Sequence, residues 1–77
     1  METKIKQVEI EIGINIRRIR KERKIGQTDL VRMVHLSGVE MTRETLVKIE
    51  RGIQHIRAIQ LRAIRDALNT SYDELLK

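Results

Sequence analysis

The chain of 77 residues contains no cysteine, no proline and a single aromatic residue, Tyr72. Without cysteine it can form neither a disulfide nor a thiolate metal site, which is usual in a reducing cytoplasm, the location we expect. The scarcity of aromatic rings argues against RNA-binding modules and single-strand grooves, because both stack bases on such rings. No apolar run approaches the ~20 residues of a membrane span, and no secretory signal is recognisable. These absences favour a small helical domain with an aliphatic core.

Positive charge is in excess, with a net charge of +5, and it is unevenly distributed. Residues 12–26 hold six cations against one glutamate, and residues 42–57 hold four cations against two glutamates. The remaining segments are neutral or slightly acidic. A surplus confined to two segments is what contact with phosphate groups needs. A solvated basic face without any partner would have the same composition, so charge alone leaves both interpretations open.

The spacing of apolar residues predicts an all-α protein, a compact five-helix bundle. In the first helix, for example, Ile12, Ile16 and Ile19 form a stripe that faces the core. Met33 and Met41 are expected to fill gaps in the same core. The predicted helices cover residues 10 or 12 to 24, 27–36, 43–51, 58–68 and a short stretch that follows the capping box Ser71–Glu74.

Residues at the predicted helix ends support these boundaries. Thr42 is a good N-cap for the third helix, and Gly52 stands where a left-handed residue commonly follows a helix. Asn69 can end the fourth helix in the same conformation. Gly26 either ends the first helix or caps the second, and the sequence leaves both roles open.

The helices over 27–36 and 43–51 are joined by a turn that contains glycine, and such a pair can place its second helix in the DNA major groove. The chain resembles the phage-repressor/Cro-like family of helix-turn-helix domains, also called the XRE family. The resemblance covers about residues 12–76 and implies a lambda-repressor-like DNA-binding domain. We place this domain at residues 10–77 and interpret residues 1–9, whose pattern is mixed, as an N-terminal arm. The motifs that carry it are Gly13 with Arg17–Arg20, Gln27 with Leu30, Ile49-Glu50-Arg51-Gly52, the stripe Leu61/Ile64/Leu68 and the closing SYDELL.

The resemblance also implies where DNA would be contacted. Arg43 and Lys48 match base-reading positions and could donate to guanine O6 and N7, although contact with phosphate is a serious alternative. Glu44 could accept from cytosine N4. The full set of positions that match DNA contacts of the family is Gln27, Thr42, Arg43, Glu44, Thr45, Lys48 and Arg51.

Other matched positions imply phosphate contact or a structural role. Gln27 corresponds to a glutamine that binds phosphate at a helix start, where free N–H groups also attract anions; an ordinary exposed residue is the alternative. Thr42 is expected to serve both as a cap and as a phosphate ligand, and Arg51 matches a position that contacts the DNA backbone. Arg20 and Glu50 match an ion pair between the first and third helices, so we interpret them as structural.

The turn departs from the family pattern. The usual spacing between the positions of Gln27 and Glu50 is roughly five residues shorter, and the usual turn has only three or four residues. The excess lies in residues 35–41. Either the helix over 27–36 is one turn longer, or the turn bulges outward.

These features predict a sequence-specific regulator of transcription, a repressor, that binds double-stranded DNA and reads the major groove with the helix over 42–51. Two alternatives use the same fold: a protein-interaction module, such as an antitoxin or a docking domain, and a non-specific architectural DNA binder. Glu44 disfavours the architectural role, because a carboxylate near phosphates helps only where it discriminates between bases.

We expect no enzyme, cofactor, metal site, membrane contact or small-molecule site. His35 and His55 lack ligand spacing, and no grouping of catalytic side chains occurs. A homodimer is expected, because the family usually gains affinity from two half-sites one helical turn apart, about 34 Å. Its predicted surface is either the apolar arm or a set of exposed apolar residues: Tyr72, Leu75 and Leu76, helped by Ile53, Ile56 and Ile59.

Overall fold

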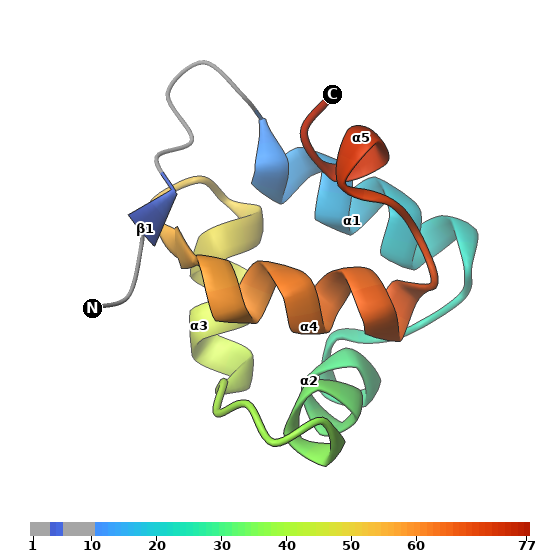
Figure 1. Ribbon diagram of the computed structural model, residues 1–77, viewed down its shortest axis with the longest axis vertical. Helices are drawn as coiled ribbons and strands as arrows, with labels where there is room; N and C mark the ends of the chain where they lie inside the picture. Colours follow the sequence, from blue (N-terminus) through green and yellow to red (C-terminus); the bar gives the residue numbers. More distant parts are fainter. Residues whose placement is uncertain (1–3, 6–10) are drawn as a thin grey trace.

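The computed structural model describes residues 4–5 and 11–77, and these form five helices and one pair of two-residue strands (Figure 1). The predicted all-α fold class is confirmed, and the helix boundaries lie within two residues of those expected. The elements in chain order are β1 (Lys4–Ile5), α1 (Ile12–Glu22), α2 (Gln27–Leu36), α3 (Arg43–Glu50), β2 (Ile56–Arg57), α4 (Ala58–Leu68) and α5 (Tyr72–Leu75).

An aliphatic core lies between the helices, and α4 crosses the centre of the view in Figure 1 with the other helices around it. The predicted stripes all face inward, since Ile12, Ile16 and Ile19 are buried together with the corresponding residues of α2, α3 and α4. Met41 is buried as expected, whereas Met33 is only half-buried. The buried core residues are Ile12, Ile16, Ile19, Leu30, Val34, Met41, Leu46, Ile49, Ile56, Leu61, Ala63, Ile64, Leu68 and Leu75.

Helices α1 to α4 are each followed, one or two residues after their last residue, by a residue with positive φ: Lys24, Gly38, Gly52 and Asn69. After α1, for example, Ile25 N–H donates to the Arg20 carbonyl and Lys24 N–H to the Lys21 carbonyl, both at 3.0 Å. This pattern satisfies helix-end carbonyl groups that would otherwise lack partners. Gly52 and Asn69 were predicted in this role. Gly26, by contrast, is the N-cap of α2 and has an extended conformation. The left-handed residue that follows α1 is Lys24.

The connection from α2 to α3 is longer than a usual helix-turn-helix turn. Helix α2 ends at Leu36, so the additional residues lie in the segment 37–42 and not in a longer helix. The segment has its own contacts: the Ser37 hydroxyl donates to the Val34 carbonyl at 2.7 Å, and Met41 N–H donates to His35 Nε2 at 3.3 Å. Because the Met41 side chain is also buried, the connection is anchored just before α3 begins.

The strand pair is a feature that the sequence did not predict. Strand β1 pairs antiparallel with β2, with Lys4 opposite Arg57 and Ile5 opposite Ile56. The pair joins the N-terminal region to the segment between α3 and α4. Of the predicted arm over residues 1–9, residues 1–3 and 6–9 lie outside the described part of the chain.

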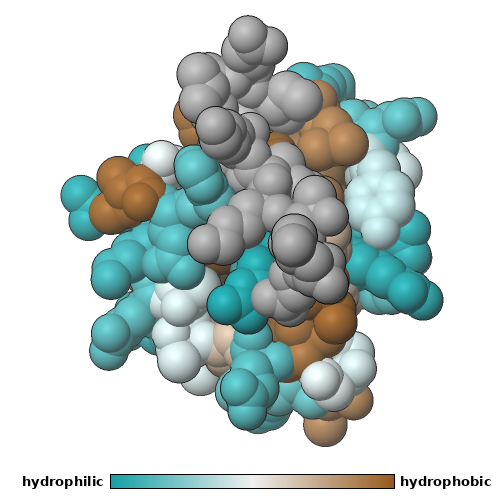
Figure 2. All heavy atoms as spheres, turned by 60° about the vertical axis from the view of Figure 1, so that its left-hand side comes forward, coloured by the Kyte–Doolittle hydropathy of each residue, from teal (hydrophilic) through white to brown (hydrophobic). Residues whose placement is uncertain are grey.

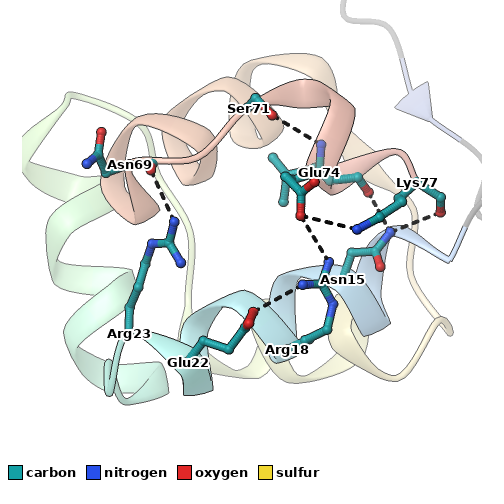
Figure 3. Close-up of polar contacts among 9 residues, drawn as sticks. Asn15, Arg18, Glu22, Arg23, Asn69, Ser71, Glu74 and Lys77 are labelled. Atoms are coloured by element: carbon teal, nitrogen blue, oxygen red, sulfur yellow. Dashed lines mark hydrogen bonds and ion pairs between the residues drawn. The ribbon is translucent and has the colours of Figure 1, made fainter.

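Helix α5 is tied to α1 by polar contacts (Figure 3). The side-chain amide of Asn15 donates to the carbonyls of Leu75 and Lys77, at 2.9 and 3.2 Å. Ser71 caps α5 by accepting from Glu74 N–H. Leu75 and Ile56 are fully buried, so their predicted place on a dimer surface is wrong: both side chains belong to the core.

Candidate nucleic-acid interface

Helix α3 has an inner and an outer face, as expected for a helix that packs on a core and presents side chains to a partner. Leu46, Ile49 and Glu50 are buried. Opposite them lie two rows with a spacing of four residues, Arg43–Val47–Arg51 and Glu44–Lys48. All of these are exposed except Val47, which is half-buried. The outer face of α3, defined by these five residues, therefore carries three cations and one carboxylate.

Thr42 and Thr45 begin α3. Thr42 is the N-cap, and its hydroxyl oxygen accepts from Thr45 N–H at 3.1 Å. The two hydroxyl oxygens also lie 3.1 Å apart. Thr45 is half-buried and lines a hollow with Thr42, Gln54 and His55, so its side chain lies away from the outer face of α3.

A buried ion pair holds α3 against α1. The Arg20 guanidinium donates from Nε to Glu50 Oε2 at 2.8 Å and from Nη2 to Glu50 Oε1 at 2.9 Å. A third bond runs from Nη1 to the Ile25 carbonyl at 3.0 Å. Two parallel bonds between a guanidinium and a carboxylate fix distance and orientation together. The predicted structural role of the pair agrees with this geometry.

Gln27, the first residue of α2, reaches the same ion pair. Its side-chain amide donates to Glu50 Oε1 at 3.3 Å. An amide has two N–H donors, so one of them is left for another acceptor. Glu50 is therefore contacted from α1 and α2 while it belongs to α3.

A hollow lies where these three helices meet, lined by Arg17, Arg20, Lys21, Gln27, Val47, Glu50 and Arg51. We call it the α1–α3 hollow. The buried Arg20–Glu50 pair lies deepest, and the exposed residues Arg17, Lys21 and Arg51 surround it. Val47 and Arg51 belong both to the hollow and to the outer face of α3. The two surfaces are thus continuous.

The exposed cations of these two surfaces form no ion pair with any described residue. In the described part of the chain, no ion pair involves Arg17, Lys21, Arg43, Lys48 or Arg51. Elsewhere some arginines are paired, as Arg32 is with Asp29 and Arg65 with Asp66. The hydrogen bonds that Arg65 donates to the Asp66 carboxylate raise the pKa of its guanidinium. Five cations without an ion pair among the described residues thus lie together beside α3, where an anionic partner would be attracted.

Among the predicted contact residues, the structure brings Arg43, Glu44, Lys48 and Arg51 onto one face, with Gln27 at its edge and Thr45 apart from it. The sequence analysis did not include Arg17 and Lys21 among the DNA contacts, although both line the α1–α3 hollow. The signal for them was the basic surplus over residues 12–26, but composition does not tell which of six cations face α3.

The described part of the chain has neither a metal-binding cluster nor a membrane-spanning helix. Among residues 4–5 and 11–77 there is no group of three or more His, Cys, Asp or Glu side chains placed to hold a metal ion. No helix within these ranges has the length and apolar character needed to cross a membrane. On the face drawn in Figure 2, apolar side chains form small groups separated by hydrophilic ones.

Comparison with known proteins agrees with this geometry. A family model described as helix-turn-helix matches residues 16–75, which is well over half of the chain. Neither the curated proteins nor the solved structures contain a significant match. The matched region begins within α1 and ends with α5, so it includes the ion pair, both helices of the motif and the core. The chain belongs to the phage-repressor/Cro-like (XRE) family of helix-turn-helix domains, which are DNA-binding domains of transcription regulators.

Proposed function

We propose that the protein is a sequence-specific, double-stranded DNA-binding repressor of transcription, and that α3 reads the major groove. The observation that carries this proposal is the outer face of α3, where three cations and one carboxylate stand free of ion pairs in the described structure. Helix-turn-helix proteins place the N-terminal residues of this helix against base edges.

The free side chains suit base edges of different kinds. Arg43 and Lys48 supply donors for guanine O6 and N7, and Glu44 supplies an acceptor for cytosine N4. Arg43 at the start of α3 and Lys48, five residues further along the helix, would reach neighbouring base pairs. Glu44 lies between them in the sequence. Its carboxylate would repel phosphate and would interact favourably only with a base that donates a hydrogen bond. A face that combines donors with an acceptor favours sequence-specific binding over binding to any duplex.

Contacts to phosphate would position the helix. Gln27 has a free amide N–H beside the first turn of α2, and Arg51 lies at the C-terminal end of the outer face. Thr42 has an exposed hydroxyl at the start of α3. Thr45 supports Thr42 through their hydrogen bond, and its own role would be to orient that hydroxyl. Such contacts fix register without reading sequence.

Repression would follow from a homodimer that covers a promoter in the cytoplasm. A two-fold dimer matches an inverted repeat whose half-sites lie about 34 Å apart. Leu75 and Ile56 are buried and drop out of the predicted dimer surface. Its remaining residues are the exposed Tyr72, Leu76, Ile53 and Ile59. Sedimentation with and without DNA tests this part; a monomer in both conditions contradicts it.

The first experiment is selection of binding sites from a random duplex pool at two salt concentrations. Wild type is compared with Arg43→Ala/Lys48→Ala and with Arg62→Ala, an exposed arginine of α4 away from α3. Enrichment of an inverted repeat by wild type and Arg62→Ala, but not by the double variant, is the expected result. No enrichment by a folded wild type would favour the protein-interaction module. Strong binding to unselected duplexes with a steep salt dependence would favour the architectural role.

A further inference from the structure

The long connection between α2 and α3 is anchored by a histidine that the proposed contacts to DNA do not use. We propose that His35 is a positioning residue for α3: its neutral imidazole holds Met41 in place, and protonation of the ring releases it. Specific binding to DNA then weakens as the pH falls through the range in which histidine side chains titrate. The inference rests on the proposed function and adds a residue that acts on DNA through α3.

The bond between His35 and Met41 requires one protonation state of the ring. Met41 N–H donates to His35 Nε2 at 3.3 Å, across six positions of the chain. A ring nitrogen that accepts a hydrogen bond carries no proton, so the proton of the neutral imidazole lies on Nδ1. In the imidazolium both nitrogens are donors, and Nε2 would then face a second donor. Because His35 is exposed, solvent can protonate it, and protonation breaks the bond.

The anchored residue lies immediately before the helix that reads DNA. The Met41 side chain is buried, and the next residue, Thr42, caps α3 by accepting from Thr45 N–H. The first predicted base-reading residue, Arg43, follows directly. The position of Met41 therefore determines where α3 begins. The additional residues of the connection make this anchor more important, because a longer loop has more conformations to restrict.

Other hydrogen bonds of the connection lie closer to α2. Val39 N–H donates to the Val34 carbonyl at 3.3 Å. Gly38 N–H donates to the His35 carbonyl at 2.9 Å. Both bonds join backbone groups and do not depend on protonation. Loss of the side-chain bond to Met41 therefore leaves the end of α2 closed and acts on the residues that lead into α3.

The groups around His35 bear on its charge in different directions. Glu40 lines the same hollow, and its carboxylate would attract an imidazolium. The last turn of α2, which contains His35, also favours positive charge. Arg32, three residues earlier on α2, opposes it but is paired with Asp29. The charged or titratable groups of the neighbouring elements are Arg43 and Glu44 in α3, Arg62 and Asp66 in α4, and His55 in the segment before β2. Protonation thus exchanges the bond to Met41 for attraction to Glu40.

Protonation of His35 acts on two kinds of DNA binding in different directions. Without the anchor, α3 is less often placed for base reading, and the apparent dissociation constant rises in proportion to the population lost. Loss of one hydrogen bond corresponds to a change on the order of fivefold. The added positive charge, by contrast, favours binding to any duplex. Specific binding should therefore weaken at lower pH while binding to unrelated duplexes does not.

The test measures dissociation constants for the selected duplex and for an unrelated one, at constant ionic strength, between about pH 7.5 and pH 5.5. The chain has two histidines, so His55→Gln is the matched control for His35→Gln. Glutamine Oε1 lies as many bonds from Cα as histidine Nε2 and accepts a hydrogen bond without titrating. Wild type and His55→Gln should lose specific affinity on the order of fivefold at the lower pH, whereas His35→Gln should show no such loss. His35→Ala should bind the selected duplex weakly at both pH values.

A second measurement reports on the anchor without DNA. In amide magnetic resonance spectra of the free protein, the Met41 N–H signal of wild type should shift as His35 titrates and should stay constant in His35→Gln. Thermal unfolding confirms that each variant is folded.

Three results would contradict the proposal in distinguishable ways. The same pH dependence of specific binding in wild type and His35→Gln, or its disappearance in His55→Gln instead, overturns the positioning role while the proposed function stands. A Met41 signal that does not follow the titration of His35 overturns the anchor alone. A wild type that prefers no duplex at any pH overturns both proposals.

Discussion

Helix α1 carries two arginines that pair with glutamates of other helices, and the two pairs differ in burial and geometry. Arg20 and Glu50 make two hydrogen bonds of 2.8 and 2.9 Å, and their side chains are 9% and 3% exposed. Arg18 and Glu74 are 3.8 Å apart, with side chains 38% and 46% exposed. The Nη2 atom of Arg18 that faces Glu74 has no hydrogen-bond partner in the described structure. The inner pair is a fixed connection, whereas the outer pair is a loose one.

The surroundings of the two pairs differ as well. Around the outer pair, charges are compensated: Arg18 also bonds to Glu22 at 3.1 Å, and Lys77 reaches Glu74 at 3.5 Å (Figure 3). Around the inner pair, Arg17 and Lys21 have no ion-pair partner among the described residues. Both sides are rich in charge, but the cations that flank the inner pair have no ion-pair partner among the described residues. Uncompensated charge is therefore a better guide to the interface than the net charge of +5.

The largest expected effect comes from breaking the inner pair. Glu50→Gln keeps the shape of the side chain but leaves the Arg20 guanidinium buried without its counter-charge, which typically costs about 3 to 5 kcal/mol. That is a large share of the roughly 4 to 12 kcal/mol expected for a domain of this size. Urea unfolding followed by circular dichroism measures the loss.

The outer pair provides the control for that variant. Glu74→Gln removes a charge from an exposed ion pair and should change the free energy of unfolding by less than about 1 kcal/mol. If Glu50→Gln is no less stable than Glu74→Gln, burial does not distinguish the two pairs and the comparison fails.

A neutral contact on the outer side should matter more than the outer ion pair. Asn15 is buried, and its amide donates to the carbonyls of Leu75 and Lys77 at the end of α5. Asn15→Ala removes both bonds and is expected to destabilise the fold by about 2 to 3 kcal/mol. Asn15→Asp, which places a carboxylate against the same carbonyls, should cost at least as much. Unfolding free energies of both variants close to wild type would show that the Asn15 hydrogen bonds do not hold α5 in place.

The sequence predicted those parts of the fold whose signals are local. The boundaries of α2 and α4 agree with apolar periodicity, and Thr42, Gly52 and Asn69 act at helix ends as expected. The Arg20–Glu50 pair spans 30 positions, so no local pattern reveals it. It was predicted only through the resemblance to the family.

Features that depend on how the helices pack were missed. Asn15 looks like an ordinary polar residue of α1 until α5 lies against it. Leu75 and Ile56 looked available to a partner because short helices and strands give no clear periodicity, yet both are buried. Among the six cations of residues 12–26, the choice of Arg17 and Lys21 required the placement of α1 beside α3.

A third prediction separates the kinds of contact on the side of the inner pair. Arg43→Ala should weaken binding to the preferred duplex by about 1 to 3 kcal/mol and relax the preference at one base position. Arg51→Ala should weaken binding to all duplexes alike and reduce the salt slope by about one. Competition titrations against single-base variants of the duplex distinguish them. Arg32→Ala, on the exposed pair with Asp29, is the control and should bind as wild type does. A uniform loss in Arg43→Ala would assign that residue to phosphate.

The smallest expected effect comes from a substitution just after the C-terminal end of α1, the helix that contains Arg18 and Arg20. Lys24 has φ of 57°, a conformation that costs a residue with a side chain roughly 1 to 2 kcal/mol and glycine almost nothing. Lys24→Gly relieves this strain but adds about 0.4 to 1 kcal/mol of chain entropy to the unfolded state. A net stabilisation of roughly 0.5 kcal/mol is therefore expected, and urea unfolding measures it. Gly52→Ala is the comparison variant. It introduces the same strain after α3 and should destabilise the fold. Since Lys24 does not line the α1–α3 hollow, its loss should leave the salt slope of DNA binding unchanged. A lower slope in Lys24→Gly would extend the DNA contact beyond the hollow to the end of α1.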